Sequence, residues 1–165
     1  MTCTTRSDGP LASLLSPKSK WPTETVAEFL NETRFPIRIA SVGAKGYPQI
    51  TSLWFVFQES RFFCCTQPQS LVCRQIRANA RVGFEIAANE PPYFGISGQG
   101  DARVVTGDPK ALLNTLTDRF LESRDPKLKA WLLSRSATEA IIEVEPERIT
   151  SWDFRKRMSA ATSKR

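Results

Sequence analysis

The chain has 165 residues, of which 41% are hydrophobic and 24% charged, and it carries a net charge of +6 and no histidine. This length and composition predict a single globular domain with a core of its own. The lack of histidine excludes Ser-His-Asp and Cys-His catalysis, histidine-bound metals and a haem with an axial histidine, so any chemistry must rest on carboxylates, Lys, Arg, Tyr, Cys or a bound cofactor.

Composition also limits location and partners. No run of about 18 apolar residues is present, and the polar N-terminus lacks the basic and apolar regions of a signal peptide, so we expect a cytoplasmic protein without membrane partners. The four cysteines match neither a zinc site nor a C-x-x-C motif, so we expect free thiols and no metal site: Cys3, Cys64, Cys65 and Cys73. No nucleic-acid motif accompanies the positive charge, so we do not expect nucleic acid as a partner.

Three regions are expected along the chain. Residues 1–20 are polar and rich in Ser, Thr and Pro, which predicts a disordered lead-in. Residues 21–157 form the expected folded domain, and residues 158–165 a basic tail. The domain begins with a helix predicted over 22–32, capped by Thr23. Its inward stripe is Val26, Phe29 and Leu30.

Residues 37–66 contain three runs rich in β-branched and aromatic residues, separated by turns at 42–48 and 58–60, which predicts an antiparallel meander. The middle strand, from Ile50 to Phe57, has largely apolar residues on both of its alternating faces. A strand with one wet face would carry polar residues at every second position. We therefore expect burial on both faces, one in a barrel interior and one against a helix, a flat aromatic ligand or a second subunit.

A helix is predicted after the third strand. Thr66 with Gln69 matches a capping box, and Ser70 is a second candidate cap. The free N–H groups at such a helix start, next to a strand end, make a natural anion site. A row of arginines follows at i, i+3 and i+7, and such a row is more often a solvated face than a phosphate clamp: Arg74, Arg77 and Arg81.

Two further strands are predicted over 81–88 and 94–105. The second contains Gly95, Gly98 and Gly100, which suggest a bend, a bulge or the close approach of another backbone or a flat ring.

Two helices and a last strand complete the chain. Asp108 caps the first helix, and the second is predicted over 126–134. A last strand is predicted over 140–145. The second helix is expected to turn three residues inward: Leu128, Trp131 and Leu132.

Four segments, in this order, resemble motifs of the pyridoxamine 5'-phosphate oxidase-like family of FMN-binding split β-barrels. Residues 44–55 resemble the family's D-G-x-P-x-x-x-P-x-W-F, and residues 66–82 resemble T-x-x-x-S-x-K-x-x-N-L-R-x-x-P-R-V. Residues 96–105 resemble V-x-x-x-G-x-A-x-x-x, and residues 146–152 resemble P-x-R-x-x-x-W. The order of predicted elements is also that of the family. The resemblance implies an α+β, mainly β fold: a six-stranded antiparallel split β-barrel with peripheral helices.

The resemblance further implies a homodimer that holds FMN or a deazaflavin in a groove between its subunits. By position, Cys65 and Thr66 would flank the ribityl chain, while Ser70 and its helix N-terminus would hold the phosphate. Trp152 and Arg155 would come from the partner subunit, although Trp152 fits equally well as a core residue at a strand end. The isoalloxazine ring would be bordered by Gln49, Ile50, Thr51, Ser52 and Leu53.

The chain departs from the family at this phosphate site. The family usually has basic residues just after the serine, where this chain has Leu71 and Val72. Arg74, one turn further on, or Arg61 would have to supply the charge-assisted contact instead. Without such a contact the site is weak, is empty or takes a different ligand.

The leading prediction is a flavin-dependent oxidoreductase that acts on an unidentified small molecule, because the cofactor would carry the hydride chemistry in a chain without histidine. Vitamin B6 oxidation ranks below oxidoreduction of another substrate, since no clear C-terminal Arg-and-His substrate motif is found. The alternative is a non-catalytic protein that binds or senses a flavin or another flat anion, and Leu71 and Val72 favour it. A nucleic-acid-associated role, which rests on net charge alone, ranks last.

Overall fold

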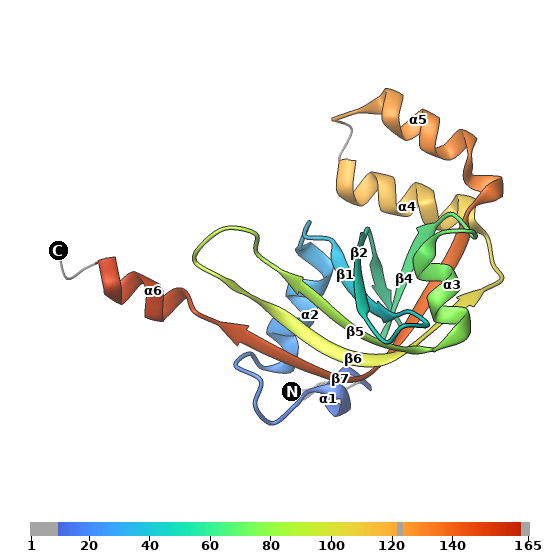
Figure 1. The fold of residues 1–165 in the computed structure, drawn as a ribbon. Coiled ribbons are helices and arrows are strands. Elements are labelled where there is room, and N and C mark those ends of the chain that lie inside the picture. The colour runs from blue at the N-terminus through green and yellow to red at the C-terminus, as the bar shows by residue number, and fades with distance from the viewer. Residues whose placement is uncertain (1–9, 122–123, 163–165) are drawn as a thin grey trace, which may run out of the picture.

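Seven antiparallel strands form one sheet that curls into a half-barrel, with helices around it (Figure 1). The computed structural model describes residues 10–121 and 124–162. The strands lie in the order β2-β1-β5-β6-β7-β4-β3. Their bounds are β1 Ile37–Val42, β2 Pro48–Leu53, β3 Val56–Gln58, β4 Arg61–Thr66, β5 Arg81–Ala87, β6 Phe94–Val105 and β7 Ala140–Asp153. The predicted mainly β, antiparallel fold with peripheral helices is confirmed, with seven strands rather than six.

The additional strand arises because the predicted middle strand is broken at Trp54 and Phe55. Before the break β2 pairs with β1, and after it β3 pairs with β4. The chain therefore passes from one end strand of the sheet to the other within two residues, which holds the two ends together and curls the sheet. Phe55 lies at this crossing, is completely buried and packs edge-on against Phe62, with 5.6 Å between ring centroids.

The prediction that the whole stretch is buried on both faces is wrong for its first half. Ile50 is 71% exposed, whereas Phe55 and Val56 are in the core. The reason is that β2 is an end strand, with a neighbour in the sheet on one side only. Alternation along the sequence does not reveal which strand will be terminal.

Helices cover the ends and one side of the half-barrel (Figure 1). The predicted stripe of α2 is confirmed, since Val26 and Leu30 are fully buried and Phe29 packs against the core. Its N-cap is Pro22 rather than Thr23, and this residue makes no side-chain capping hydrogen bond. The helix bounds are α1 Pro10–Leu14, α2 Thr23–Glu32, α3 Leu71–Ala78, α4 Pro109–Leu121, α5 Pro126–Ser134 and α6 Arg155–Thr162, with a short 3-10 turn at Ser136–Thr138.

The segment expected as a disordered lead-in begins its described part with α1, and the residues after this helix are held by hydrogen bonds to β7. After α1, the Ser16 N–H donates to the Ile149 carbonyl at 2.8 Å, and the Lys20 N–H donates to the Ser151 carbonyl at 3.1 Å. The chain from α1 to α2 therefore runs along β7. Residues 1–9 lie outside the described residues, as do residues 163–165 of the expected basic tail, whose earlier part belongs to α6.

The last strand is much longer than predicted and reaches Asp153 instead of residue 145. Pro146 lies opposite Gly100, where the β6–β7 register shifts between Gln99 and Gly100. A proline has no N–H to donate to a ladder, and a bulge is one of the places where a sheet tolerates it. The strand β7 therefore continues past Pro146, the residue before which the predicted strand ended.

Helix α5 has the predicted bounds but not the predicted orientation. Leu128 and Trp131 are 37% and 53% exposed, and no described residue of α5 is buried. The helix lies beside α4 beyond the rim of the half-barrel (Figure 1). Its apolar residues therefore do not join the barrel core. Among the described residues, no helix is long and apolar enough to cross a membrane.

Candidate functional site

A pocket of about 450 Å³ lies between the ends of β2 and β4 and the helix pair α4 and α5. Three predicted site residues line it: Ser52 and Leu53 at the end of β2, and Cys65 in β4. We call it the α4–α5 pocket. The rest of its lining is apolar apart from one carboxylate: Pro36, Trp54, Leu113, Leu116, Leu128, Leu132 and Glu139.

Burial shifts both titratable groups of this pocket toward their neutral forms. The pKa of the Cys65 thiol is raised to about 12, first by burial and then by the negative charge of Glu139. Its Sγ lies 3.8 Å from the Pro109 carbonyl, to which it donates. Burial also raises the pKa of the Glu139 carboxyl, while the charge of Arg135 opposes this shift. Cys65 is therefore a neutral thiol near pH 7 and not a nucleophilic thiolate.

The predicted phosphate site is the capped start of α3. Ser70 Oγ accepts a hydrogen bond from the Cys73 N–H at 3.4 Å, so Ser70 rather than Thr66 caps this helix. Leu71 is 46% exposed and Val72 is buried, so neither offers a polar group to an anion. The polar partners that remain at this end are the helix N–H groups and the Ser70 hydroxyl.

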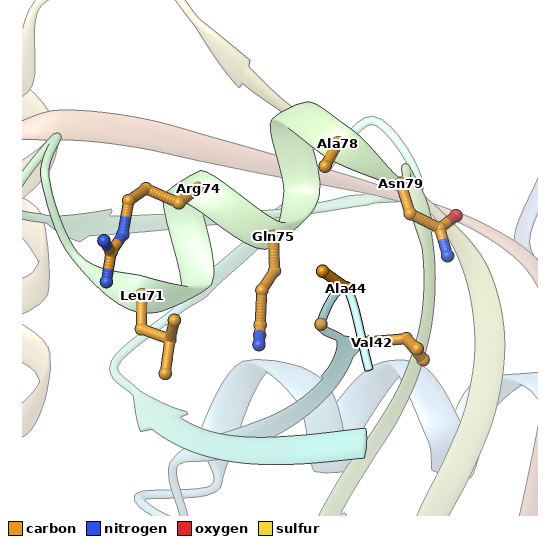
Figure 2. Close-up of a pocket in the computed structure, with 8 residues that line it drawn as sticks. Val42, Ala44, Leu71, Arg74, Gln75, Ala78 and Asn79 are labelled. Atoms are coloured by element: carbon orange, nitrogen blue, oxygen red, sulfur yellow. The ribbon is translucent and has the colours of Figure 1, made fainter. Parts of the chain in front are cut away.

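A second hollow, of about 420 Å³, separates α3 from the turn after β1, and we call it the α3 groove (Figure 2). Arg74 lines it, and its guanidinium makes no hydrogen bond or ion pair with the residues that the structure describes. Arg61 instead lies at the far end of β4, where Glu143 and Glu145 each contact it at 3.4 Å. Of the two cations proposed to replace the missing basic residues, Arg74 is thus the one available to a ligand at α3.

Gln75 was not predicted, and it connects the predicted site residue Gln49 to the fold. Its side chain is buried between α3 and the first two strands. Ser41 Oγ donates to Gln75 Oε1 at 2.6 Å, and Gln75 Nε2 donates to Gln49 Oε1 at 2.6 Å. A sequence signal existed, because Gln75 stands at the asparagine position of the motif quoted for residues 66–82. Glu139 was also missed, and no motif in the sequence marks it.

Trp152 and Arg155 lie far from these two hollows within one chain. Cys65 and Thr66 pair with the start of β7, whereas Trp152 is near the end of this 14-residue strand. Arg155 is ion-paired with Asp153 at 2.6 Å and lies 4.5 Å from the Phe94 ring centroid. The Arg155 hydrogen bonds hold the pKa of the Asp153 carboxyl well below its usual range. A contribution of Trp152 and Arg155 to the site stays a prediction that requires a second subunit.

The predicted residues therefore fall into separate groups. The α4–α5 pocket holds Ser52, Leu53 and Cys65. The surroundings of α3 hold Gln49, Ser70 and Arg74. Thr51 and Thr66 are half-buried near the ends of their strands, and Ile50 is exposed on β2. The two hollows flank the region where β2 and β4 approach each other.

This region fits the chemical parts of a flavin. Among the described residues, the outer edge of β2 has no partner strand, so its backbone N–H and C=O groups are open to the polar atoms of a ring. The α4–α5 pocket adds apolar walls, and Ser70 and Arg74 add contacts suited to a phosphate. Within the described part of the chain, no three His, Cys, Asp or Glu residues are placed to hold a metal ion.

Comparison with known protein families agrees with this fold. The sequence model of the pyridoxamine 5'-phosphate oxidase family matches residues 22–153. The chain therefore belongs to this family. A search of curated protein sequences found no match.

Solved structures of similar fold come from proteins of different description. Rv2991, a conserved hypothetical protein from Mycobacterium tuberculosis, has a TM-score of 0.72 and 19% identity, over 87% of this chain and 92% of that one. An F420 reductase has a TM-score of 0.60 and 24% identity, over 74% and 94%. HutZ, the haem storage protein from Vibrio cholerae, has a TM-score of 0.60 and 18% identity, over 79% and 92%. At these identities the likeness concerns the fold.

Proposed function

We propose that this protein is a flavin-binding oxidoreductase whose cofactor lies in a groove between two copies of the chain. The observation that carries the proposal is the open edge of β2, which lies between an apolar pocket and a capped helix start with an available arginine. Membership of the pyridoxamine 5'-phosphate oxidase family supports it.

Each part of the rim would have a separate task. A bound flavin supplies hydride transfer, and the protein supplies position and a dry environment. The edge of β2, with Gln49 fixed by Gln75, would orient the ring. Ser70 and Arg74 would bind the phosphate, and the apolar walls of the α4–α5 pocket would exclude water from the reacting face.

FMN is the proposed cofactor, and a deazaflavin is the alternative because an F420 reductase shares the fold. A haem storage protein shares it as well, but this chain has no histidine to serve as an axial ligand. The substrate is a small organic molecule, and no described feature points to nucleic acid.

A non-catalytic role in binding or sensing a flavin or another flat anion is the second candidate. Leu71 and Val72 favour it, because a phosphate at Ser70 would lack directly adjacent cations. Weak cofactor retention fits a sensor better than an enzyme that keeps its flavin through turnover.

An absorbance spectrum of the purified protein, recorded before and after FMN is added and unbound ligand is removed, tests the proposal. One retained flavin per chain, reduced by NADPH or another donor and reoxidised by an acceptor, supports the oxidoreductase. Retained flavin that no donor reduces supports the second candidate, and a folded dimer that retains none contradicts FMN.

The phosphate site gives the first mutational prediction. Arg74→Ala should weaken FMN binding by about 10- to 100-fold, because a charge-assisted hydrogen bond contributes roughly 1.5–3 kcal/mol. Ser70→Ala combined with it should weaken binding further and lower stability by about 1 kcal/mol through loss of the cap. Fluorescence titration with FMN and urea unfolding measure the two effects separately.

Arg81→Ala is the matched control, since it removes the same charge beyond the C-terminal end of α3. It should leave the FMN affinity within about twofold of the wild type. Equal affinities for the wild type and the Arg74→Ala, Ser70→Ala double variant would remove the proposed phosphate site.

A further inference from the structure

Apolar side chains of helix α5 do not pack into the barrel core and instead face a pocket. Leu128 and Leu132 line the α4–α5 pocket, opposite Leu113 and Leu116 of α4 and the rim of the sheet. Leu113 and Leu116 are buried residues of α4, whereas no described residue of α5 is buried. The two helices and the rim therefore border an open, mainly apolar pocket that the chain itself does not fill.

The polar side chains that line the pocket are few, apart from the indole of Trp54: Ser52 in β2, Cys65 in β4 and Glu139 in the loop before β7. The Cys65 thiol already donates to the Pro109 carbonyl, so it offers little more. The Glu139 carboxylate, by contrast, accepts no hydrogen bond from any residue in the described part of the chain. A carboxylate beside leucines accepts from O–H and N–H donors and repels anions.

We propose that the α4–α5 pocket is the binding site for the oxidoreductase's organic substrate, which is an uncharged or cationic, mainly apolar molecule with one O–H or N–H group that donates to Glu139. This substrate class rests on the proposed function. The pocket itself, as an apolar site with a single carboxylate, rests on the geometry alone.

Size and location agree with this role. A volume of about 450 Å³ lies within the roughly 300–1,000 Å³ range of pockets that enclose small organic ligands. Ser52 and Leu53, which line the pocket, are among the residues predicted to border the flavin ring, and Cys65, which also lines it, is predicted to flank the ribityl chain. A molecule held between α4 and α5 would therefore lie next to the ring, as a hydride donor or acceptor must.

The pocket is tested with naphthalene probes on the full-length protein, first without cofactor. 2-Naphthol carries one O–H donor, 2-methoxynaphthalene has the same ring without the donor, and 2-naphthoate is an anion. Calorimetric titration should give saturable binding of 2-naphthol at one site per chain, and at least tenfold weaker binding of the other two. Equal affinity for 2-naphthol and 2-naphthoate, or no binding of 2-naphthol, overturns the proposal.

Two variants test whether 2-naphthol binds in the α4–α5 pocket. Leu128→Lys puts a charged side chain on the pocket wall and should weaken 2-naphthol binding at least tenfold. Trp131→Lys is the matched control: it makes the same kind of change at an exposed position of α5 that does not line the pocket, and it should leave the affinity unchanged. Similar losses in both variants, or none in either, would show that the probe binds elsewhere.

A third variant tests the carboxylate without altering the packing. Glu139→Gln keeps the size of the side chain and removes the charge, so it should reduce the preference of the pocket for 2-naphthol over 2-naphthoate. An unchanged preference would exclude Glu139 from recognition. These comparisons between ligands need no flavin, so a protein that binds 2-naphthol but retains no flavin would contradict the proposed function and leave the pocket standing.

A second set of titrations, with FMN present, tests whether 2-naphthol binds beside the flavin in a protein that retains both ligands. If 2-naphthol binds beside the flavin, the absorbance band of bound FMN should shift on titration, and Leu128→Lys should abolish that shift. Binding of both ligands without any spectral effect would overturn the assignment of the pocket as the substrate site.

Discussion

Gln75 connects three elements around the site through one buried amide. It accepts from Ser41 in β1 and donates to Gln49 in β2, and its own backbone belongs to α3. A Cβ atom at position 43 would lie only 2.9 Å from Gln75 Nε2, so Gly43 leaves the space that the amide occupies. The position of Gln49 on the open edge of β2 therefore depends on a residue that would not itself need to contact the cofactor.

Gln75→Leu should lower the free energy of unfolding by about 1–3 kcal/mol, because Ser41 and Gln49 lose their partner and Ser41 is completely buried. It should also weaken FMN binding, since Gln49 is no longer fixed. Urea unfolding followed by tryptophan fluorescence measures the first effect, and FMN titration the second. The control is Gln69→Leu, the same substitution at an exposed loop position just before α3. If both variants were as stable as the wild type, the bonds of Gln75 would contribute nothing to the fold.

At the scale of single elements, β6 shows why its glycines are needed. A Cβ atom at position 98 would lie 2.3 Å from Phe84 Cζ and 2.4 Å from the Arg148 carbonyl oxygen. At position 100 it would lie 2.2 Å from the Glu145 carbonyl oxygen. These close approaches, together with the bulge beside Gly100, let β6 pass between β5 and β7 as the sheet curls. The glycines of this strand were expected to mark a bend, a bulge or the close approach of another backbone or a flat ring. The structure shows a bulge and the close approach of another backbone.

Gly98→Ala should therefore destabilise the protein by about 1–3 kcal/mol, because the added methyl group overpacks against a core phenylalanine and a strand backbone. Gly83→Ala is the control in the neighbouring strand β5, where the nearest atoms to an added Cβ are 3.9 Å away. It should cost much less. Thermal unfolding measures the melting temperatures of the two variants. Equal values for Gly98→Ala and Gly83→Ala would contradict the close approach at Gly98.

Local signals predicted elements well where caps and turn residues mark their ends. The predicted bounds of β6 and α5 are those observed, since Asn-Glu-Pro-Pro precedes the strand and Asp125-Pro126 starts the helix. The predictions failed where contacts with residues distant in the sequence determine the bounds of a strand. The break between β2 and β3 depends on the closure of the half-barrel, and the length of β7 depends on a bulge next to Pro146. Nothing local to α5 indicates that its leucines line a pocket.

The candidate site divides in the same way. Ser70 was recognisable as a cap from its position before a helix, and the structure confirms that cap. The grouping of Ser52 and Leu53 with Cys65 could not be derived from spacing, because it depends on β2 and β4 meeting across the curled sheet. The partner of Gln75, Gln49, lies 26 residues away in the chain, so the motif position marks Gln75 but does not show what it binds. Glu139 is placed in the pocket only by the fold, and no motif marks it.

At the scale of the whole molecule, the exposed edge of β2 requires an explanation. Tyr47 and Ile50 are 74% and 71% exposed, and no strand in the described part of the chain pairs with the outer side of β2. Proteins usually cover or charge such an apolar edge, because an open one promotes aggregation. At the other end of the chain, α6 continues beyond the end of β7, away from the half-barrel (Figure 1). A second copy that covers the β2 edge would account for both features.

Ile50→Lys should convert the proposed homodimer into a folded monomer, because a lysine at the centre of the interface would lose its hydration without a partner. Light scattering after gel filtration should then give a mass near 18.5 kDa, compared with twice that value for the wild type. Ile50 is a better test than Phe55, whose complete burial means that its replacement would unfold the chain. Leu128→Lys, on α5, should remain a dimer and serves as the control. A wild-type monomer, or an Ile50→Lys variant that stays dimeric and binds FMN normally, would place the interface and the cofactor away from β2.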